Sequence, residues 1–176
     1  MDKVVFLDRD GTIIVDKGYV HKKKDLEFLP NAVKGMKKLQ NSGYRLIIAS
    51  NQSGIGRGYF SKEDYFDFRH YMDEKLRKNK VSITAEYFCP HVPEDNCDCR
   101  KPRIGMLEKA ARIFNLNLRE CWMIGDSERD IQAGKSAGCR TIQILIGEEK
   151  TSLILPDFTA RDLLEAADYI LGNKNK

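Results

Sequence analysis

Near its start the chain reads Val4-Val5-Phe6-Leu7-Asp8-Arg9-Asp10-Gly11-Thr12. The four apolar residues predict a buried strand, and the glycine predicts a turn soon after it. Because strand side chains alternate, Asp8 and Asp10 leave on the same side and can share one metal ion or one reacting phosphorus atom. A structural alternative is that the two aspartates only end the strand and open a turn, which is a common use of Asp-x-Asp-Gly.

Length and composition favour one domain spanning residues 1–176. The chain has 176 residues, of which 41% are hydrophobic and 32% are charged. A chain of this length can bury about two thirds of the surface that it exposes when unfolded. No apolar run approaches the roughly 20 residues of a membrane span, and no secretory pattern begins the chain. We therefore expect a cytoplasmic protein with no membrane partner.

The charge of the chain is modestly positive, at +4. Basic residues gather at Lys22, Lys23 and Lys24 and in the tail at Lys174 and Lys176. Either cluster could hold nucleic acid, but lysines in a polar loop and at a chain end are more often solvated surface. A modest positive field also suits a small anionic substrate, and we expect no nucleic-acid partner.

Short apolar runs alternate with helical patterns along the chain. Strands are predicted at residues 4–7, 45–49, 85–88, 121–124 and 141–144. Helices are predicted between them, from the N-cap Asn31 to the stop at Gly43, from a capping box at Ser61 through residue 76, and over 104–114, 128–137 and 163–170. This alternation predicts an α/β fold of Rossmann-like type, with a doubly wound, mostly parallel sheet covered on both faces.

Polar clusters follow four of these strands. Asp8 and Asp10 follow the first, residues 50–54 follow the second, residues 100–102 follow the third after a detour, and residues 125–127 follow the fourth. Ligands of such sheets bind beyond the carboxyl ends of the strands. The sequence therefore predicts that these clusters meet in one site.

Three of the five cysteines lie within eleven residues, beside a histidine. The potential ligands are Cys89, His91, Cys97 and Cys99. Three thiols and one imidazole complete a tetrahedral zinc set, which is typical of a structural ion with no open catalytic position. Reduced surface cysteines near an unrelated histidine are the alternative. Because Arg100 and Lys101 follow the last ligand, a folded zinc loop over residues 89–99 would fix both cations.

Taken together, Asp8-x-Asp10-Gly-Thr, Ser50 at the end of the second strand, Lys101-Pro102 and Gly125-Asp126-x-x-x-Asp130 resemble the haloacid dehalogenase superfamily of phosphotransferases. The four motifs occur in order across most of the chain. The resemblance implies a magnesium-dependent phosphatase, a phosphoric monoester hydrolase that works through an aspartyl phosphate. It also implies a capless form of the fold, which needs no second chain to complete its site, so we expect a monomer.

Phosphate ester hydrolysis needs a nucleophile, a proton donor and cations, and the chain offers each. Asp8 is the expected nucleophile, and Asp10 is the expected acid and then base. We expect Asp8, the Asp10 carbonyl and Asp126 to bind Mg²⁺, while Ser50, Lys101 and amides near Gly11 hold the phosphoryl group. The role of Asp130 stays open, because it could orient Lys101 or a metal-bound water, or cap its helix.

Within the superfamily, the pattern Cys-x-His…Cys-x-Cys-Arg-Lys-Pro resembles two groups, the D-glycero-D-manno-heptose 1,7-bisphosphate 7-phosphatases and the histidinol-phosphate phosphatases. Residues 15–21 and 50–58 resemble the heptose group. That resemblance implies a role in making nucleotide-activated heptose for lipopolysaccharide, with a small phosphorylated sugar as substrate. It also implies that Arg100 recognises the second phosphate and that Lys101 stabilises the phosphoryl group. The residues implied to contact the sugar and phosphate are Asp16, Lys17, Gly18, Tyr19, Ser50, Asn51, Gln52 and Ser53.

Two alternatives remain at this stage. A histidinol-phosphate phosphatase of histidine biosynthesis is one, because the five residues between His91 and Cys97 form a short loop, and Ser127 stands where some heptose enzymes have lysine. A zinc-stabilised nucleic-acid-binding module without catalysis is the other. The intact acidic motifs and the absence of interleaved aromatic residues disfavour that module. The sequence does not indicate which anomer, alpha or beta at C1, the enzyme prefers.

Overall fold

The computed structural model describes residues 3–145 and 153–172, and its centre is a six-stranded parallel sheet. The strand order is β3-β2-β1-β4-β5-β6, with every neighbouring pair parallel. The strands are β1 (Lys3–Leu7), β2 (Tyr44–Asn51), β3 (Ala85–Cys89), β4 (Trp122–Gly125), β5 (Arg140–Ile144) and β6 (Phe158–Ala160). The order reverses at β1, so the carboxyl ends of β1, β2 and β4 meet at a switch point.

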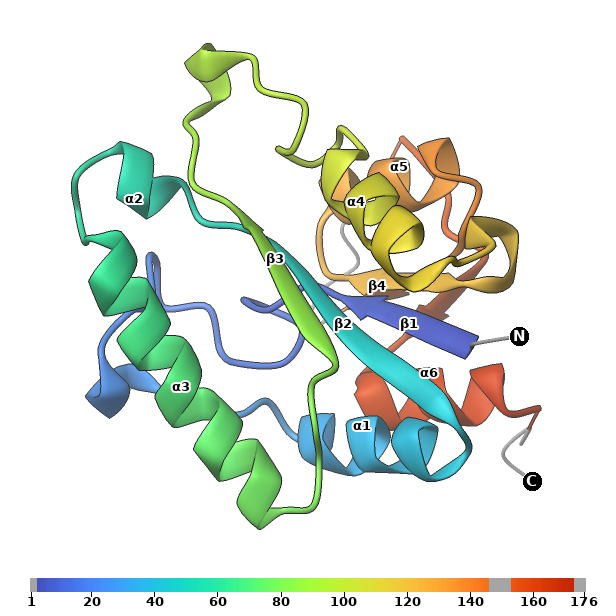
Figure 1. Cartoon of the computed structure of the whole chain (residues 1–176). Helices are drawn as coiled ribbons and strands as arrows, with labels where there is room; N and C mark the ends of the chain where they lie inside the picture. Colours follow the sequence, from blue (N-terminus) through green and yellow to red (C-terminus); the bar gives the residue numbers. More distant parts are fainter. Residues whose placement is uncertain (1–2, 146–152, 173–176) are drawn as a thin grey trace.

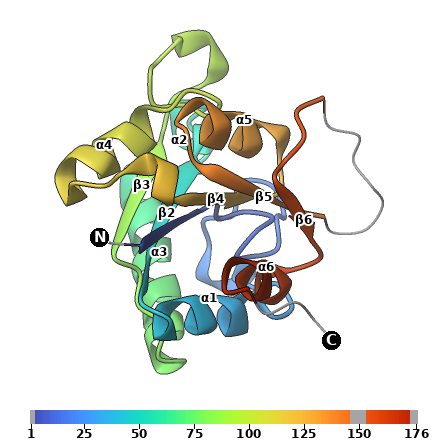
Figure 2. The ribbon, with the colours of Figure 1, turned by 90° about the vertical axis from the view of Figure 1, so that its right-hand side faces the viewer.

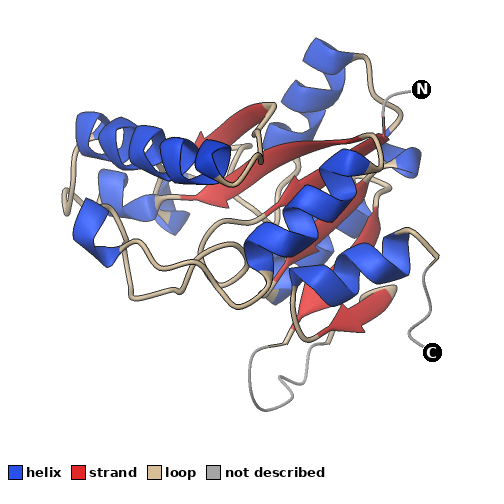
Figure 3. Ribbon diagram, turned by 90° about the horizontal axis from the view of Figure 1, so that it is seen from below, coloured by secondary structure: helices blue, strands red, loops and turns tan. Residues whose placement is uncertain are grey.

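Helices cover both faces of this sheet (Figures 1 and 2). They are α1 (Ala32–Asn41), α2 (Ser53–Gly56), α3 (Lys62–Lys78), α4 (Gly105–Phe114), α5 (Glu128–Ser136) and α6 (Leu163–Ile170), with short 3-10 turns η1 (Lys23–Asp25), η2 (Pro93–Asp95) and η3 (Leu118–Glu120). Figure 2 shows α4 and α5 above the sheet and α1 and α6 below it. Figure 3, which views the molecule from below, shows helices lying over the strands.

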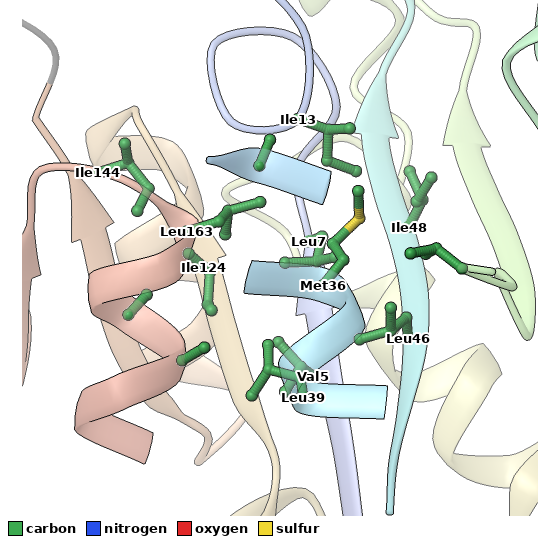
Figure 4. Packing of buried hydrophobic residues seen from close by; sticks show 14 of the residues in the cluster. Val5, Leu7, Ile13, Met36, Leu39, Leu46, Ile48, Ile124, Ile144 and Leu163 are labelled. Atoms are coloured by element: carbon green, nitrogen blue, oxygen red, sulfur yellow. The ribbon is translucent and has the colours of Figure 1, made fainter. Parts of the chain in front are cut away.

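The alternation of β1 divides the core into two halves. Val5 and Leu7 pack with residues of α1, α3 and α6, whereas Val4 and Phe6 pack on the other face with residues of α4. Figure 4 shows the first half, with Met36 of α1 beside Leu7 between neighbouring strands. All four strand residues are fully buried. A strand buried on both faces has no polar alternation, which explains the continuous apolar run at residues 4–7.

The predicted α/β fold is confirmed, with differences at several elements. The five predicted strands and five predicted helices are present, but β6 has three residues and gave no sequence signal. Asn31 occupies the N-cap position without capping, because it adopts a left-handed conformation and its Nδ2 donates to Asp162 (2.8 Å). Ser61 and Asp64 do form the capping box. Lys174 and Lys176 lie outside the described residues. None of the described helices is long and apolar enough to cross a membrane.

Candidate active site

A cavity of about 600 Å³ opens at the carboxyl ends of the central strands. Its size lies within the range of small-molecule sites, about 300–1,000 Å³. The predicted site residues that line it are Asp8, Asp10, Asp16, Gly18, Tyr19, Ser50, Asn51, Gln52, Ser53, Arg100, Lys101 and Asp126. Lys17 is not among the lining residues, and its ammonium pairs with Glu27 (2.8 Å). The fold thus gathers side chains from four separate stretches of sequence.

Asp8 and Lys101 form the floor of the cavity. The Lys101 Nζ lies 2.8 Å from Asp8 Oδ1 and 2.5 Å from Asp130 Oδ1, and it also donates to the carbonyl of Ala49 (2.6 Å). Burial raises the pKa of the Asp8 carboxyl to about 8, and the adjacent Lys101 opposes that rise. Burial alone would lower the pKa of Lys101, but Asp130 and Asp8 outweigh it and hold that pKa above its ordinary value. Lys101 is therefore a permanent cation beside Asp8.

The backbone of Lys101 is clamped to the end of β2. Asn51 Nδ2 donates to the Lys101 carbonyl (3.0 Å), and the Lys101 amide donates to Asn51 Oδ1 (3.0 Å). Arg100 is tied to the preceding loop, because its Nη1 donates to the carbonyl of His91 (3.2 Å). These bonds set the positions of both cations relative to the strand ends.

Asp130 performs two of the roles left open by the sequence. One oxygen pairs with Lys101, while Oδ2 accepts from the amide (3.1 Å) and hydroxyl (2.6 Å) of Ser127 and so caps α5. Each role uses a different oxygen of the buried carboxylate. The side chain thereby links the start of α5 to the cation at the floor of the cavity.

The donor set at the strand ends fits a hard divalent cation. Carboxylate oxygens of Asp8, Asp126 and Asp130 lie within 4.8 Å of one another. Gly11 has φ +78°, and a Cβ there would lie 2.5 Å from Asp126 Oδ2, so the turn after β1 approaches this carboxylate as only glycine can. Three carboxyl groups meet here around one ammonium, and Mg²⁺ prefers such oxygen ligands.

Asp10 is held apart from this cluster by its neighbours. Its carboxylate accepts two hydrogen bonds from Arg9, each of 3.0 Å, and a third from Gln52 Nε2 (2.9 Å). Gln52 Nε2 also donates to Ser50 Oγ (2.7 Å), which joins the end of β2 to the turn after β1. Asp10 therefore has a fixed orientation at the cavity wall.

The segment before η1 forms one wall of the cavity. Asp16 Oδ1 accepts from the amide of Gly18 (2.8 Å), which makes a local turn. Tyr19 is half-exposed, has φ +53° and packs edge-on against Tyr59, with ring centroids 4.8 Å apart. An exposed aromatic ring on a tight turn at a cavity mouth can contact a ligand.

The four predicted zinc ligands converge in the loop between β3 and α4. Cys89 Sγ lies 3.6 Å from His91 Nδ1 and 3.5 Å from Cys97 Sγ. Cys99 Sγ lies 3.3 Å from His91 Nδ1 and 3.5 Å from Cys97 Sγ. A tetrahedron with zinc–sulfur bonds of about 2.3 Å has edges of nearly this length. The remaining cysteines, Cys121 and Cys139, are buried in the core.

Sequence reasoning missed several residues of the site. Arg57, Pro93 and Arg129 also line the cavity. Arg9 is buried beneath the cavity and donates a hydrogen bond to Asp10. The alternation of strand side chains did not predict this contact. The position of Arg9 between two aspartates was the available signal, since a buried carboxylate favours a neighbouring guanidinium.

Comparisons with known proteins agree with this geometry. A family model described as HAD-hydrolase-like matches residues 98–166. The D-glycero-beta-D-manno-heptose-1,7-bisphosphate 7-phosphatase of Haemophilus ducreyi is 40% identical over 169 residues, covering 87% of this chain and 92% of that protein. The D-glycero-alpha-D-manno-heptose-1,7-bisphosphate 7-phosphatase of Campylobacter jejuni is 43% identical over 148 residues, covering 84% of each.

A solved structure extends the similarity to the fold. The D,D-heptose 1,7-bisphosphate phosphatase from B. bronchiseptica, crystallised with magnesium and phosphate, aligns with a TM-score of 0.86 and 28% identity. The alignment covers 98% of this chain and 99% of that one.

Proposed function

The chain belongs to the heptose bisphosphate phosphatases of the haloacid dehalogenase superfamily, and from this premise we propose that it removes the C7 phosphate of D-glycero-D-manno-heptose 1,7-bisphosphate. The product, the 1-phosphate, serves the synthesis of nucleotide-activated heptose. One observation carries the proposal: Asp8 lies at the floor of a cavity of about 600 Å³, 2.8 Å from a buried ammonium. A carboxylate nucleophile beside a fixed cation is suited to phosphoryl transfer.

The reaction has two steps, and both use Asp8 and Asp10. In the first, an oxygen of Asp8 attacks phosphorus, the bond to the C7 oxygen breaks, and Asp10 gives its proton to that oxygen. In the second, Asp10 takes a proton from water as the water oxygen attacks phosphorus, which releases phosphate and regenerates Asp8. One carboxyl group thus acts as acid and then as base.

Magnesium fits the carboxylates at the strand ends. We assign its binding to Asp8, the Asp10 carbonyl and Asp126. When bound, it neutralises charge on the phosphoryl oxygens. Lys101 adds a second positive charge on the other side of Asp8, held by Asp130, and Ser50 offers a hydroxyl donor. Transfer of a phosphoryl group depends mainly on such positioning and charge.

Substrate recognition is assigned to the cavity walls. The turn at Asp16, Gly18 and Tyr19 and the residues after β2 face the sugar and the reacting phosphate. Arg100 is assigned to the phosphate at C1, because a guanidinium forms paired hydrogen bonds with phosphate oxygens. Lys17 does not line the cavity, and we do not place it at the substrate.

Zinc is proposed for the site formed by Cys89, His91, Cys97 and Cys99. Burial raises the pKa of the Cys89 thiol, so its thiolate needs a nearby cation. The loop carries Arg100 at its end, and Arg100 bonds to the carbonyl of the ligand residue His91. We infer that zinc fixes this loop and, through it, a substrate-binding cation.

The proposal is tested by phosphate release, with magnesium, from both anomers of the heptose bisphosphate and from histidinol phosphate. Relatives are named for each anomer, so both belong in the assay. We expect the larger kcat/KM for a heptose bisphosphate, with the C1 phosphate retained in the product. A preference for histidinol phosphate would move the enzyme to histidine biosynthesis and contradict the proposal. Loss of the C1 phosphate instead of the C7 phosphate would contradict the assigned orientation.

A further inference from the structure

Arg9 is a charged side chain buried beneath the cavity, with 1% of its surface exposed. Its Nε and Nη2 donate to the two oxygens of Asp10, each at 3.0 Å. The same Nη2 donates to the carbonyl of Val20 (2.8 Å) and to Gln52 Oε1 (3.1 Å). One guanidinium therefore joins the acid-base carboxylate, the substrate wall that ends at Val20 and the end of β2.

The stability of the fold does not by itself explain why an arginine occupies this buried position. Its guanidinium carbon lies 5.0 Å from the ring centre of Phe68 and 5.7 Å from that of Tyr65, both on α3. Among the described residues, its Nη1 has no hydrogen-bond partner. Removing a guanidinium from water carries a large desolvation penalty, and apolar residues of similar volume commonly stabilise a core equally well. The side-chain hydrogen bonds of Arg9, in contrast, go to Asp10, to Val20 and to Gln52, around the cavity.

We propose that Arg9 is a positioning residue for proton transfer, a role that rests on the proposed function of Asp10. The paired hydrogen bonds fix both oxygens of Asp10, so that one of them faces the leaving oxygen. The bond to Val20 places the wall carrying Gly18 and Tyr19 relative to that carboxylate. Substrate seated against this wall is thereby brought into register with its proton donor. A misplacement of about 1 Å can lower a rate about 100-fold.

The test compares leaving groups. Arg9→Lys keeps a positive charge but cannot form the paired bonds. In the first step, an alkyl phosphate such as the heptose bisphosphate needs a proton on its leaving oxygen, whereas p-nitrophenyl phosphate releases a stable phenolate without one. For Arg9→Lys we expect the single-turnover rate on the alkyl ester to fall by about 10-fold to 100-fold and that on the aryl ester by less than about 3-fold.

The second step gives an independent readout. Because Asp10 also activates the water, Arg9→Lys should break down its phosphoenzyme slowly, and p-nitrophenyl phosphate should give a burst of nitrophenol close to one equivalent per site. Asp10→Asn serves as the reference for complete loss of the acid and base. A variant that was only misfolded would lower the burst amplitude and both first-step rates together.

Arg69→Met is the matched structural control. Arg69 pairs with the buried Glu86 (3.0 Å), which bonds to Tyr65 under the guanidinium of Arg9, but Arg69 does not touch Asp10. Its loss should lower the unfolding temperature and leave the alkyl-to-aryl ratio of rates unchanged. Equal losses on both esters for Arg9→Lys, without a burst, would overturn the role of Arg9. The comparison holds for any alkyl phosphate that the wild type hydrolyses, so rejection of the heptose would refute only the proposed substrate.

Discussion

At the scale of single residues, Asp130 contributes both to the stability of the fold and to the arrangement of the cavity. Its two oxygens serve different partners, Lys101 and the amide and hydroxyl of Ser127. In Asp130→Asn, the amide nitrogen would face the Lys101 ammonium, or the cap of α5 would be lost. Removing one member of a buried ion pair costs about 3 kcal/mol or more, although Asp8 still pairs with Lys101. We expect lower activity and a free energy of unfolding reduced by about 2–3 kcal/mol, measured by urea denaturation.

Asp64→Asn is the control for the cap alone. Asp64 Oδ2 accepts from the amide (2.8 Å) and hydroxyl (2.9 Å) of Ser61 at the exposed start of α3, and Asp64 does not line the cavity. Loss of an exposed cap costs about 1 kcal/mol, and turnover should persist. If Asp130→Asn lost no more stability than Asp64→Asn and kept full activity, Asp130 would serve only as a cap.

The sequence predicted the reactive residues of the cavity better than the residues that form hydrogen bonds with them. Asp8, Asp10 and Lys101 were identified because each carries reactive chemistry in a recognisable motif. Arg9 was missed because strand alternation ends at the turn, and only the turn geometry aims its side chain at Asp10. Asn51 was expected at the substrate; it lines the cavity, where its side chain clamps the backbone of Lys101. Such bonds depend on the approach of chain segments about 50 residues apart, which a local pattern does not encode.

At the scale of elements, the cysteine loop links a proposed metal to the cavity. Cys97→Ser removes one of the four proposed ligands. We expect zinc content below one per chain and kcat/KM lowered by about 10-fold to 100-fold, because the loop no longer fixes Arg100. Zinc is measured by atomic absorption and activity by phosphate release.

Cys121→Ser is the matched control for the loss of a thiol. Cys121 is buried in the core before β4, far along the chain from the loop, and burial raises its pKa to about 11. This variant should lose stability and retain both its zinc and its kcat/KM. Full activity of zinc-free Cys97→Ser would show that the loop needs no metal to hold Arg100.

The edge strand β6 is held by Asp157, which precedes it. Asp157 Oδ2 accepts from the amide (2.7 Å) and hydroxyl (2.8 Å) of Thr141 on β5. Burial would raise the pKa of Asp157, but these hydrogen bonds and Lys135 outweigh it and lower that pKa below 3.8. A lowered pKa means that ionised Asp157 stabilises the fold above the unfolded value, and this contribution disappears as the pH falls through the folded value.

Asp157→Asn should therefore destabilise the protein by about 1 kcal/mol at pH 7. The difference from wild type should shrink as the pH falls below about 3.8, because the wild-type carboxyl group then loses its charge. Urea denaturation of both proteins between pH 7 and pH 3 measures this difference. A difference that stayed constant over the whole range would show that the charge of Asp157 has no role.

The helices and strands that the sequence predicted are those with strong hydrophobic patterns. The continuous apolar runs of β1 and β2 and the helical stripes of α3 and α6 were visible. β6 was not, since three residues of an edge strand carry almost no periodicity and its stability comes from Asp157 and Thr141. Asn31 has the residue type of an N-cap, but contact with Asp162 at the start of α6 determines its conformation.

At the scale of the whole molecule, strand order explains where the chemistry lies. β1 and β4 are neighbours although more than a hundred residues separate them, and this pairing brings Asp8 beside Asp126 and Asp130. The sequence predicted a parallel sheet and a common edge for the polar clusters. It could not give the order of the strands, because pairing between distant segments depends on how both faces are covered.

The two proposed metals should be separable in the intact protein. Brief treatment with EDTA should remove magnesium, held by oxygen atoms and water, and lower turnover by about 100-fold or more. The circular dichroism spectrum should not change, and added Mg²⁺ should restore activity. Zinc measured after the treatment is the control, since a set of three thiolates and one imidazole binds zinc more firmly. Full turnover in EDTA, with magnesium shown to be absent, would contradict the magnesium site.

We propose that Asp8 carries the phosphoryl group during hydrolysis of the heptose bisphosphate. The most direct test is to quench the reaction with borohydride, which reduces an aspartyl phosphate to homoserine, and to sequence the N-terminal peptide by mass spectrometry. Asp8→Asn, which nearly preserves side-chain volume, should fold, lack turnover and give no trapped product. The wild type should yield homoserine at position 8 only when substrate is present. Trapping at another residue, or turnover by Asp8→Asn, would contradict it.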